Sequence, residues 1–157
     1  MRDADIHPLL TSFGDPIAMQ FYPATKSRAQ VLDWIEANRA RYATDGFGLW
    51  AVELRATGDV IGDCGITLQP VEGVVVPEIG YRIVRSEWGR GFATEAAMTC
   101  RDWFFASTAG QRVVSIVDPA NVASRRWERA GGREMCLYET TRAWTPLTTL
   151  LARTILA

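Results

Sequence analysis

A strand, a glycine-containing loop and a helix follow one another from residue 78 onward, and this succession constrains the fold more than any other feature of the chain. The stretch Glu78–Val84 reads as extended, and the six residues Trp88-Gly89-Arg90-Gly91-Phe92-Ala93 form the loop. From Thr94 on, a helix of about three turns is predicted, because four apolar residues recur at helical spacing: Ala96, Ala97, Cys100 and Phe104. A strand that leads through a loop into a helix is typical of an α/β domain.

The glycines of this loop point to a phosphate group. Small residues in a strand-to-helix turn let successive backbone N–H groups converge on one point. The dipole of the following helix adds partial positive charge there, so a pyrophosphate suits the loop. Arg85 and Arg90 can supply further charge. An ordinary turn before a helix is the alternative, because a lone GxG is a weak motif.

The chain begins with predicted helices. Residues 5–19 favour two short helical turns, broken at Gly14-Asp15-Pro16. Ser27 is the predicted N-cap of a longer helix, with Gln30 completing a capping box. Gly46-Phe47-Gly48 ends that helix.

Extended segments come next. Residues 49–54 and 60–68 read as strands joined by a turn, and 74–84 as a third extended stretch. Pro77 interrupts that stretch, and we expect it at an edge, a bulge or a strand start.

After the helix that begins at Thr94, a short apolar strand is predicted over 113–117. Asp118-Pro119-Ala120-Asn121 leads into a short helix that ends at Gly131-Gly132. Met135 to Tyr138 is a further strand, while 144–155 permits either a strand or a helix. The whole order predicts one α/β domain over residues 1–157 with a mixed sheet.

Composition excludes several classes of partner and site. Lys and Arg number 17 against 18 Asp and Glu, a balance that argues against nucleic acid as the main partner. His7 is the only histidine, which argues against a zinc site and removes any Ser-His or Cys-His nucleophile. The three cysteines, Cys64, Cys100 and Cys136, are predicted to be reduced and buried. The charged N-terminus and the lack of a long apolar run predict a soluble, cytoplasmic protein without a membrane partner.

Three segments, in order, resemble the GNAT N-acetyltransferase superfamily. The run from Gly80-Tyr81 through Trp88 to Ala96 is similar to its acyl-CoA-binding motif, in the branch of the ribosomal-protein N-terminal acetyltransferases. The segment 121–126, Asn-Val-Ala-Ser-Arg-Arg, resembles that branch's NxxS helix start. The segment from Gly48 to Gly65 resembles its early hairpin.

The resemblance implies an α/β (α+β) domain whose mixed, mostly antiparallel sheet is flanked by helices and splays between its fourth and fifth strands. It implies acetyl-CoA as a co-substrate, with no metal. The pantetheine arm would lie between the splayed strands and bond to the backbone of Ile83, Val84 and Arg85. Asn121 and Ser124 would face that arm near the thiol. The pyrophosphate would lie on backbone N–H groups of the loop: Gly89, Arg90, Gly91, Phe92, Ala93 and Thr94.

Simpler interpretations accompany two of these residues. Asn121 also suits a helix cap, a role compatible with the first. Ser124 also suits a solvent-facing position in a first helical turn.

The sequence departs from the family in four places. Trp88 stands where the superfamily often has Gln or Arg. Trp127 and Glu128 occupy the region of the Tyr that often protonates the leaving thiolate, so that acid is not assigned. The helix after Asn121 is one residue short and ends in Gly131-Gly132. The family's first strand, which would precede Asp3, is absent from the sequence.

Glu78 is the candidate base for an acceptor amine, and Ser124 is the second candidate catalytic residue. A carboxylate on the strand beside the cofactor could act directly or through water, although a solvated strand carboxylate is the simpler alternative. Tyr81 could line the acceptor site or belong to the core. A backbone N–H near Ile83 or Val84 would polarise the thioester carbonyl.

We therefore expect an N-acetyltransferase, monomeric or homodimeric, that acts on a primary amine of a protein N-terminus or a small molecule. A non-catalytic acyl-CoA-binding protein is the alternative, based on the missing Tyr and the short N-terminus. A nucleotide-binding module of another fold is disfavoured, since the sequence has no GxxxxGK[ST] pattern.

Overall fold

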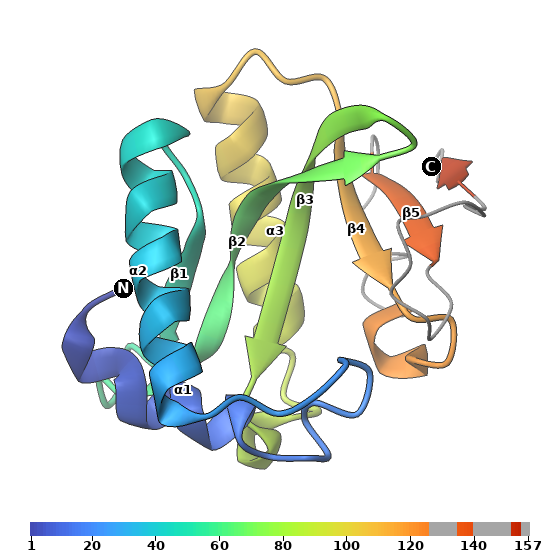
Figure 1. The fold of residues 1–157 in the computed structure, drawn as a ribbon. Coiled ribbons are helices and arrows are strands. Elements are labelled where there is room, and N and C mark those ends of the chain that lie inside the picture. The colour runs from blue at the N-terminus through green and yellow to red at the C-terminus, as the bar shows by residue number, and fades with distance from the viewer. Residues whose placement is uncertain (126–134, 140–151, 155–157) are drawn as a thin grey trace.

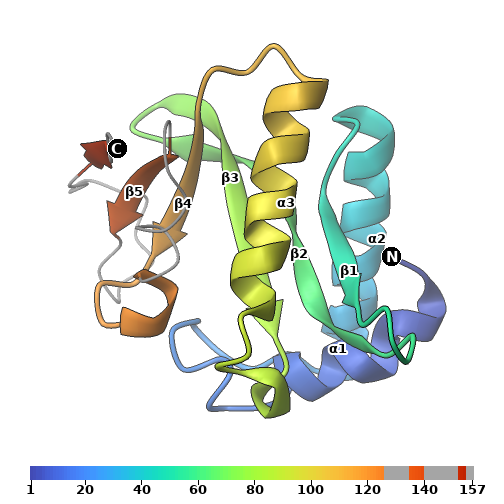
Figure 2. The same cartoon turned by 180° about the vertical axis from the view of Figure 1, so that it is seen from behind.

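An open sheet with helices on both faces forms the framework of the molecule (Figure 1). The computed structural model describes residues 1–125, 135–139 and 152–154. Its strands are β1 (Leu49–Glu53), β2 (Val60–Val71), β3 (Val74–Ile83), β4 (Val113–Val117), β5 (Met135–Glu139) and β6 (Ala152–Thr154). Its helices are α1 (Ile6–Phe13), α2 (Arg28–Thr44) and α3 (Phe92–Ser107), with short 3-10 turns η1 (Asp3–Asp5) and η2 (Arg85–Glu87). Helices α1 and α2 cover one face, and α3 covers the other (Figure 2).

The sheet is mixed, and its strands lie in the order β1-β2-β3-β4-β5-β6. The pairs β1–β2, β2–β3 and β5–β6 are antiparallel, while β3–β4 and β4–β5 are parallel. Strand β3 is in register with β2 from Val74 to Ile83, yet with β4 only at Glu78 and Val114. The expected splay therefore lies between β3 and β4. These two strands are numbered fourth and fifth in the prediction from the sequence, because the family's fold has a further strand that would precede Asp3.

A capping box starts α2 as predicted. The Ser27 Oγ accepts a hydrogen bond from the Gln30 N–H, and the Gln30 side chain accepts one from the Ser27 N–H. Val31 and Ile35 are fully buried on the face that packs against α1. Asn38 is also fully buried, and its Oδ1 accepts from the Leu49 N–H at 2.9 Å. This bond ties α2 to the first residue of β1.

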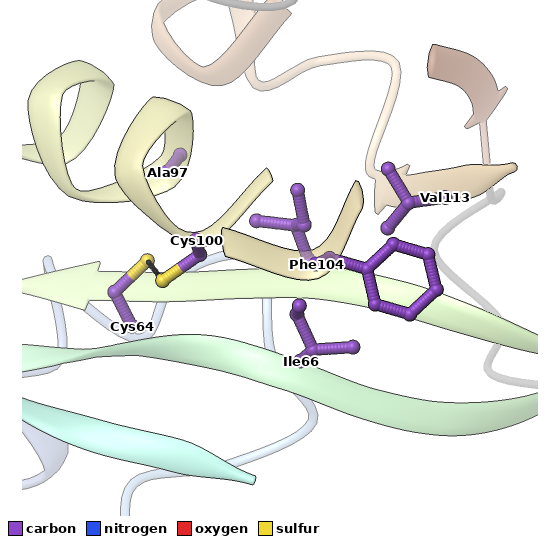
Figure 3. Close-up of a cluster of buried hydrophobic side chains, with 7 residues drawn as sticks. Cys64, Ile66, Ala97, Cys100, Phe104 and Val113 are labelled. Carbon is purple, nitrogen blue, oxygen red and sulfur yellow. Dashed lines mark hydrogen bonds between the residues drawn. The ribbon is translucent and has the colours of Figure 1, made fainter. Parts of the chain in front are cut away.

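The core beneath α3 is built from small and apolar side chains (Figure 3). Ala97, Cys100 and Phe104 of the helix pack on Ile66 and Val113 of the sheet, among others. Cys64 and Cys100 are buried free thiols with their Sγ atoms 3.7 Å apart, which confirms the prediction for these two. The side chain of Cys136 lies outside the described residues.

Helix α3 begins two residues earlier than predicted and is longer. It starts at Phe92 rather than Thr94 and continues for 16 residues, beyond the three turns expected. Gly91 precedes it with a φ of 87°, a left-handed conformation that glycine adopts without steric cost. The chain therefore turns into the helix directly after the second glycine.

Pro77 occupies a different position from those expected. It lies inside β3, opposite Leu68, and the register with β2 continues unbroken past it. Pro77 has no N–H to donate. Because β4 is in register with β3 only at Glu78, few hydrogen bonds between these two strands are lost by its absence.

Part of the C-terminal prediction lies outside the described residues. Residues 122–125 are helical, while Trp127, Glu128 and Gly131-Gly132 are not described. The strand expected from Met135 is present as β5, and within the ambiguous tail Ala152–Thr154 forms β6. In the described part of the chain, no helix has the length and apolar character needed to cross a membrane.

Candidate active site

A cavity of about 500 Å³ opens where β3 and β4 separate. Its walls come from the middle of β3, from β4 and the turn after it, from α2 and from the segment before α2. Four residues that the sequence singled out line it together: Glu78, Tyr81, Asn121 and Ser124. The open part of the sheet is therefore also the place where these side chains meet.

Glu78 sits at the last point where the two strands are in register. The Thr67 hydroxyl donates to Glu78 Oε2 at 3.4 Å, and the Gln69 amide in turn donates to Thr67 Oγ1 at 3.2 Å. Burial raises the pKa of Glu78 to about 6, while hydrogen bonds from Gln69, the Ile116 backbone and Thr67 oppose a larger rise. A carboxylate with this pKa is mostly ionised at neutral pH and suited to general base catalysis. Glu78 is half-buried in the wall of the cavity.

The turn after β4 brings Asn121 and Ser124 to the opposite wall. Asn121 Oδ1 accepts from the Ser124 N–H at 3.1 Å, so Asn121 caps the short helix that follows. The Tyr81 hydroxyl donates to the Ser124 carbonyl oxygen at 3.5 Å across the opening. Ser124 is half-buried rather than solvent-facing, and its hydroxyl makes no hydrogen bond within the described residues. Tyr81 both lines the cavity and packs on the core beneath α3.

The end of β3 presents backbone groups to the splay. The Val84 N–H donates to the Ile61 carbonyl of β2 at 2.8 Å, so the N–H and C=O of Ile83 point to the other side, where β4 diverges. The Ile83 carbonyl accepts from the Trp88 indole Nε1 at 2.7 Å. The carbonyls of Val84 and Arg85 accept from Glu87 and Trp88 N–H groups. The Ile83 N–H therefore stays open to a ligand on this edge, and the Arg85 N–H also donates no hydrogen bond within the described residues.

The loop before α3 carries a row of backbone donors. The N–H groups of six consecutive residues, Gly89, Arg90, Gly91, Phe92, Ala93 and Thr94, donate no hydrogen bond within the described residues, and the first bond of the helix runs from Glu95 to Gly91. Gly89 and Gly91 have φ values of 75° and 87°, and nothing lies within 4 Å of the point where a Cβ on either would stand. Such a row at a helix N-terminus is suited to a phosphate.

The two arginines near this loop are paired with carboxylates. Arg85 Nε lies 2.9 Å from Asp15 Oδ2, and the Arg90 guanidinium pairs with Glu87. Arg90 also lies 4.9 Å from the centre of the Phe92 ring. Both side chains are more than half exposed, so each could also contact a bound phosphate.

Sequence reasoning missed two groups of cavity residues. Thr67 and Gln69, two residues apart on β2, face the same side of the sheet, and this alternation was a readable signal. The second group surrounds the Trp34 indole, whose Nε1 donates to Asp63 Oδ2 at 3.1 Å. It consists of three cationic side chains, Lys26, Arg41 and Arg82.

Across residues 1–125 and the two short described strands, no three His, Cys, Asp or Glu side chains are grouped so that they could hold an ion.

Known proteins share this architecture. Residues 1–133 match the family model described as an acetyltransferase (GNAT) domain. The chain is 36% identical over 132 residues to the uncharacterised protein YkkB of Bacillus subtilis (strain 168), covering 84% of this chain and 76% of that protein. It is 28% identical over 155 residues to the uncharacterised N-acetyltransferase p20 of Bacillus licheniformis, covering 88% and 85% of the two chains.

Solved structures agree with this similarity. The acetyltransferase from Agrobacterium tumefaciens strain C58 superposes with a TM-score of 0.72 at 25% identity, covering 83% of this chain and 75% of that one. The aminoglycoside acetyltransferase AAC(6')-Ib, solved in complex with coenzyme A, superposes with a TM-score of 0.66 at 15% identity, covering 83% and 79%. At that identity the second comparison shows the fold alone.

Proposed function

This chain belongs to the GNAT acetyltransferase family, and we propose that it transfers an acetyl group from acetyl-CoA to a primary amine, of a protein N-terminus or of a small molecule. The observation that carries the proposal is the row of unpaired N–H groups at the start of α3, next to the open edge of β3. A ligand that bears a pyrophosphate at one end and an extended amide arm at the other fits these two features together.

Cofactor binding would use the loop and the splay. The pyrophosphate would lie on the N–H groups of Gly89, Arg90, Gly91, Phe92, Ala93 and Thr94, where the helix dipole also favours negative charge. The pantetheine arm would run along Ile83, Val84 and Arg85. Of the backbone groups there, the Ile83 N–H faces the splay and, like the Arg85 N–H, donates no hydrogen bond within the described residues, while the carbonyls are already bonded.

Chemistry would take place at the other end of the cavity. Glu78 would accept a proton from the acceptor ammonium or amine, directly or through water, so that the nitrogen lone pair can attack the thioester carbon. As the carbon–nitrogen bond forms, negative charge develops on the carbonyl oxygen, and a backbone N–H near Ile83 or Val84 would stabilise it. The carbon–sulfur bond then breaks. The Ser124 hydroxyl, on the opposite wall, would hydrogen-bond the departing thiolate.

A calorimetric titration tests the cofactor half of this proposal. CoA should bind at least about a hundredfold more tightly than pantetheine, which lacks the phosphates, because several charge-assisted hydrogen bonds to the loop are lost. Equal affinities would contradict the assignment of the loop.

A turnover assay tests the transferase half. Acetyl-CoA and a panel of primary amines should release free thiol, with the acetylated amine identified by mass spectrometry. Tight CoA binding without transfer to any amine would instead favour a non-catalytic acyl-CoA-binding protein of the same fold.

A further inference from the structure

Three cationic groups gather around one indole ring in the wall of the cavity. The Lys26 Nζ lies 5.5 Å from the centre of the Trp34 ring, and the guanidinium carbons of Arg82 and Arg41 lie 5.7 Å and 5.9 Å from it. The three side chains come from different parts of the chain, the segment before α2, β3 and α2 itself, and all of them line the cavity.

Only one of the three has a carboxylate partner among the described residues. Arg82 Nη2 lies 3.2 Å from Asp63 Oδ2, and both side chains are buried, so this pair is neutral within the wall. Arg41 donates to Asn38 Oδ1, an uncharged amide, at 3.3 Å. Within the described part of the chain, neither Arg41 nor Lys26 lies within ion-pair distance of a carboxylate. This wall therefore carries two positive charges that have no ion-pair partner among the described residues.

Both of these cations are partly removed from water. Lys26 and Arg41 are half-buried, and each lies against the apolar face of Trp34. In such surroundings the effective dielectric constant is lower than in bulk water, so an anion is attracted more strongly than at an exposed surface. Planar arginine and pointlike lysine together are a common recognition pair for carboxylate and phosphate groups.

The same cavity is also lined by a negative group that suits an amine. Glu78 lines the cavity from β3, and it is ionised at neutral pH. A cavity of about 500 Å³ is of the size that takes a small ligand. One molecule with a positive end and a negative end would match both walls.

We propose that the acceptor is a small primary amine that also carries an anionic group, a carboxylate or a phosphate, which Lys26 and Arg41 bind while the amine faces Glu78. This inference rests on the proposed transferase function and narrows its acceptor class.

Matched pairs of acceptors test the inference. Amino acids are the first set of acceptors, their own carboxamides the second, and aminoalkyl phosphonates the third. All are assayed with acetyl-CoA and the full chain. The anionic member of a pair should have a kcat/KM about tenfold to a hundredfold higher than the neutral one, mainly through a lower KM. Comparison of the carboxylate and phosphonate arms then identifies which anion is preferred.

Variants link the preference to the two cations. Arg41→Gln and Lys26→Met should each bring the kcat/KM for the anionic acceptor to within about threefold of the kcat/KM for its neutral partner. Arg28→Gln makes the same charge change at an exposed position on the same helix, outside the cavity, and should keep the wild-type ratio. High salt should reduce the wild-type ratio as well, because it screens the attraction.

The outcomes separate the two proposals. If CoA binds but neutral amines react as well as anionic ones, or no anionic amine in the panel is acetylated, the inference is wrong. A wild-type ratio in both Arg41→Gln and Lys26→Met would also overturn it. If CoA does not bind at all, the transferase function itself is wrong.

Discussion

The raised pKa of Glu78 bears directly on its proposed role as the general base. Burial raises this pKa to about 6, so the base form accumulates above that pH. We predict that Glu78→Gln lowers kcat/KM about a hundredfold or more near neutral pH, since general base catalysis contributes on that scale. The wild-type rate should rise through about pH 6, and the variant should lack this rise. As the pH approaches the pKa of the acceptor amine, the deficit should shrink.

A pH profile of kcat/KM with the same amine for both proteins measures this difference. CoA affinity, titrated by calorimetry, serves as the control, because the proposed function gives the Glu78 side chain no contact with the cofactor. Parallel profiles for the two proteins would show that Glu78 is not the base.

Glu78→Gln should lower activity but raise stability at neutral pH. The pKa of the Glu78 carboxyl group rises from an ordinary value of 4.5 to about 6 on folding, so the folded state binds its proton more tightly. Stability from this group is therefore present below about pH 4.5 and is lost as the pH rises through about 6. Glu78→Gln should raise the free energy of unfolding at neutral pH by up to about 2 kcal/mol, with no gain in acid. Urea unfolding of both proteins at neutral pH and below about pH 4.5 measures this difference in the free energy of unfolding. A variant less stable than wild type at neutral pH would contradict the desolvation account.

A substitution at Gly91 can show whether the loop before α3 binds CoA or only shapes the fold. The Gly91 φ of 87° is strained for any residue with a Cβ, yet nothing lies within 4 Å of where that Cβ would stand. We predict that Gly91→Val still folds, with a loss of about 1–2 kcal/mol in stability, and binds CoA about a hundredfold less tightly. The side chain would occupy the space in front of the loop donors and keep the phosphates away from them.

Gly73 provides a matched control for that variant. It has a φ of 79°, also with nothing within 4 Å of a built Cβ, but it lies in the turn between β2 and β3. Gly73→Val should lose similar stability and keep wild-type CoA affinity. If the two valine variants bind CoA equally well, the loop is only a turn.

At the scale of elements, the sequence predicted those parts whose signal is local. The capping box of α2 and the apolar spacing on α3 lie within single segments, and both elements are present. The start of α3 was placed late because its first turn, Phe92 to Thr94, is only half-buried and carries little apolar pattern. The cationic wall was missed because Lys26, Arg41 and Arg82 come together only through tertiary packing around Trp34.

Helix α2 supports that wall, and its N-terminal cap should contribute measurably to stability. Ser27→Ala removes the acceptor for the Gln30 N–H and leaves a donor of the first turn without its partner. We predict a loss of about 1 kcal/mol in the free energy of unfolding, measured by urea titration. Ser86→Ala is the control, because Ser86 is exposed and its hydroxyl makes no hydrogen bond within the described residues. Equal stability of the two variants would mean that the cap contributes nothing.

For the molecule as a whole, the seam between β3 and β4 is the feature that links fold to function. On one side lie α1, α2 and the long β2–β3 hairpin, and on the other lies β4, with a single registered pair between the two sides. The Ser115 hydroxyl adds a second link, since it donates to the Ile79 carbonyl oxygen at 3.2 Å. A ligand that occupies this seam would bridge two parts of the sheet that otherwise share few backbone hydrogen bonds.

Acetyl-CoA should therefore raise the melting temperature of the whole chain. A ligand that binds only the folded state stabilises it by about 2.7 kcal/mol at a concentration one hundred times its Kd. For a domain of this size that corresponds to roughly 5–10 °C. ATP and NAD offer phosphates to the loop but no pantetheine arm to the seam, so their shifts at equal concentration should be much smaller. Thermal unfolding with each ligand, for the wild type and for Gly91→Val, measures both halves of the site at once. The Gly91→Val protein should lose most of the acetyl-CoA shift, and equal shifts from all three ligands would show that the seam does not select this cofactor.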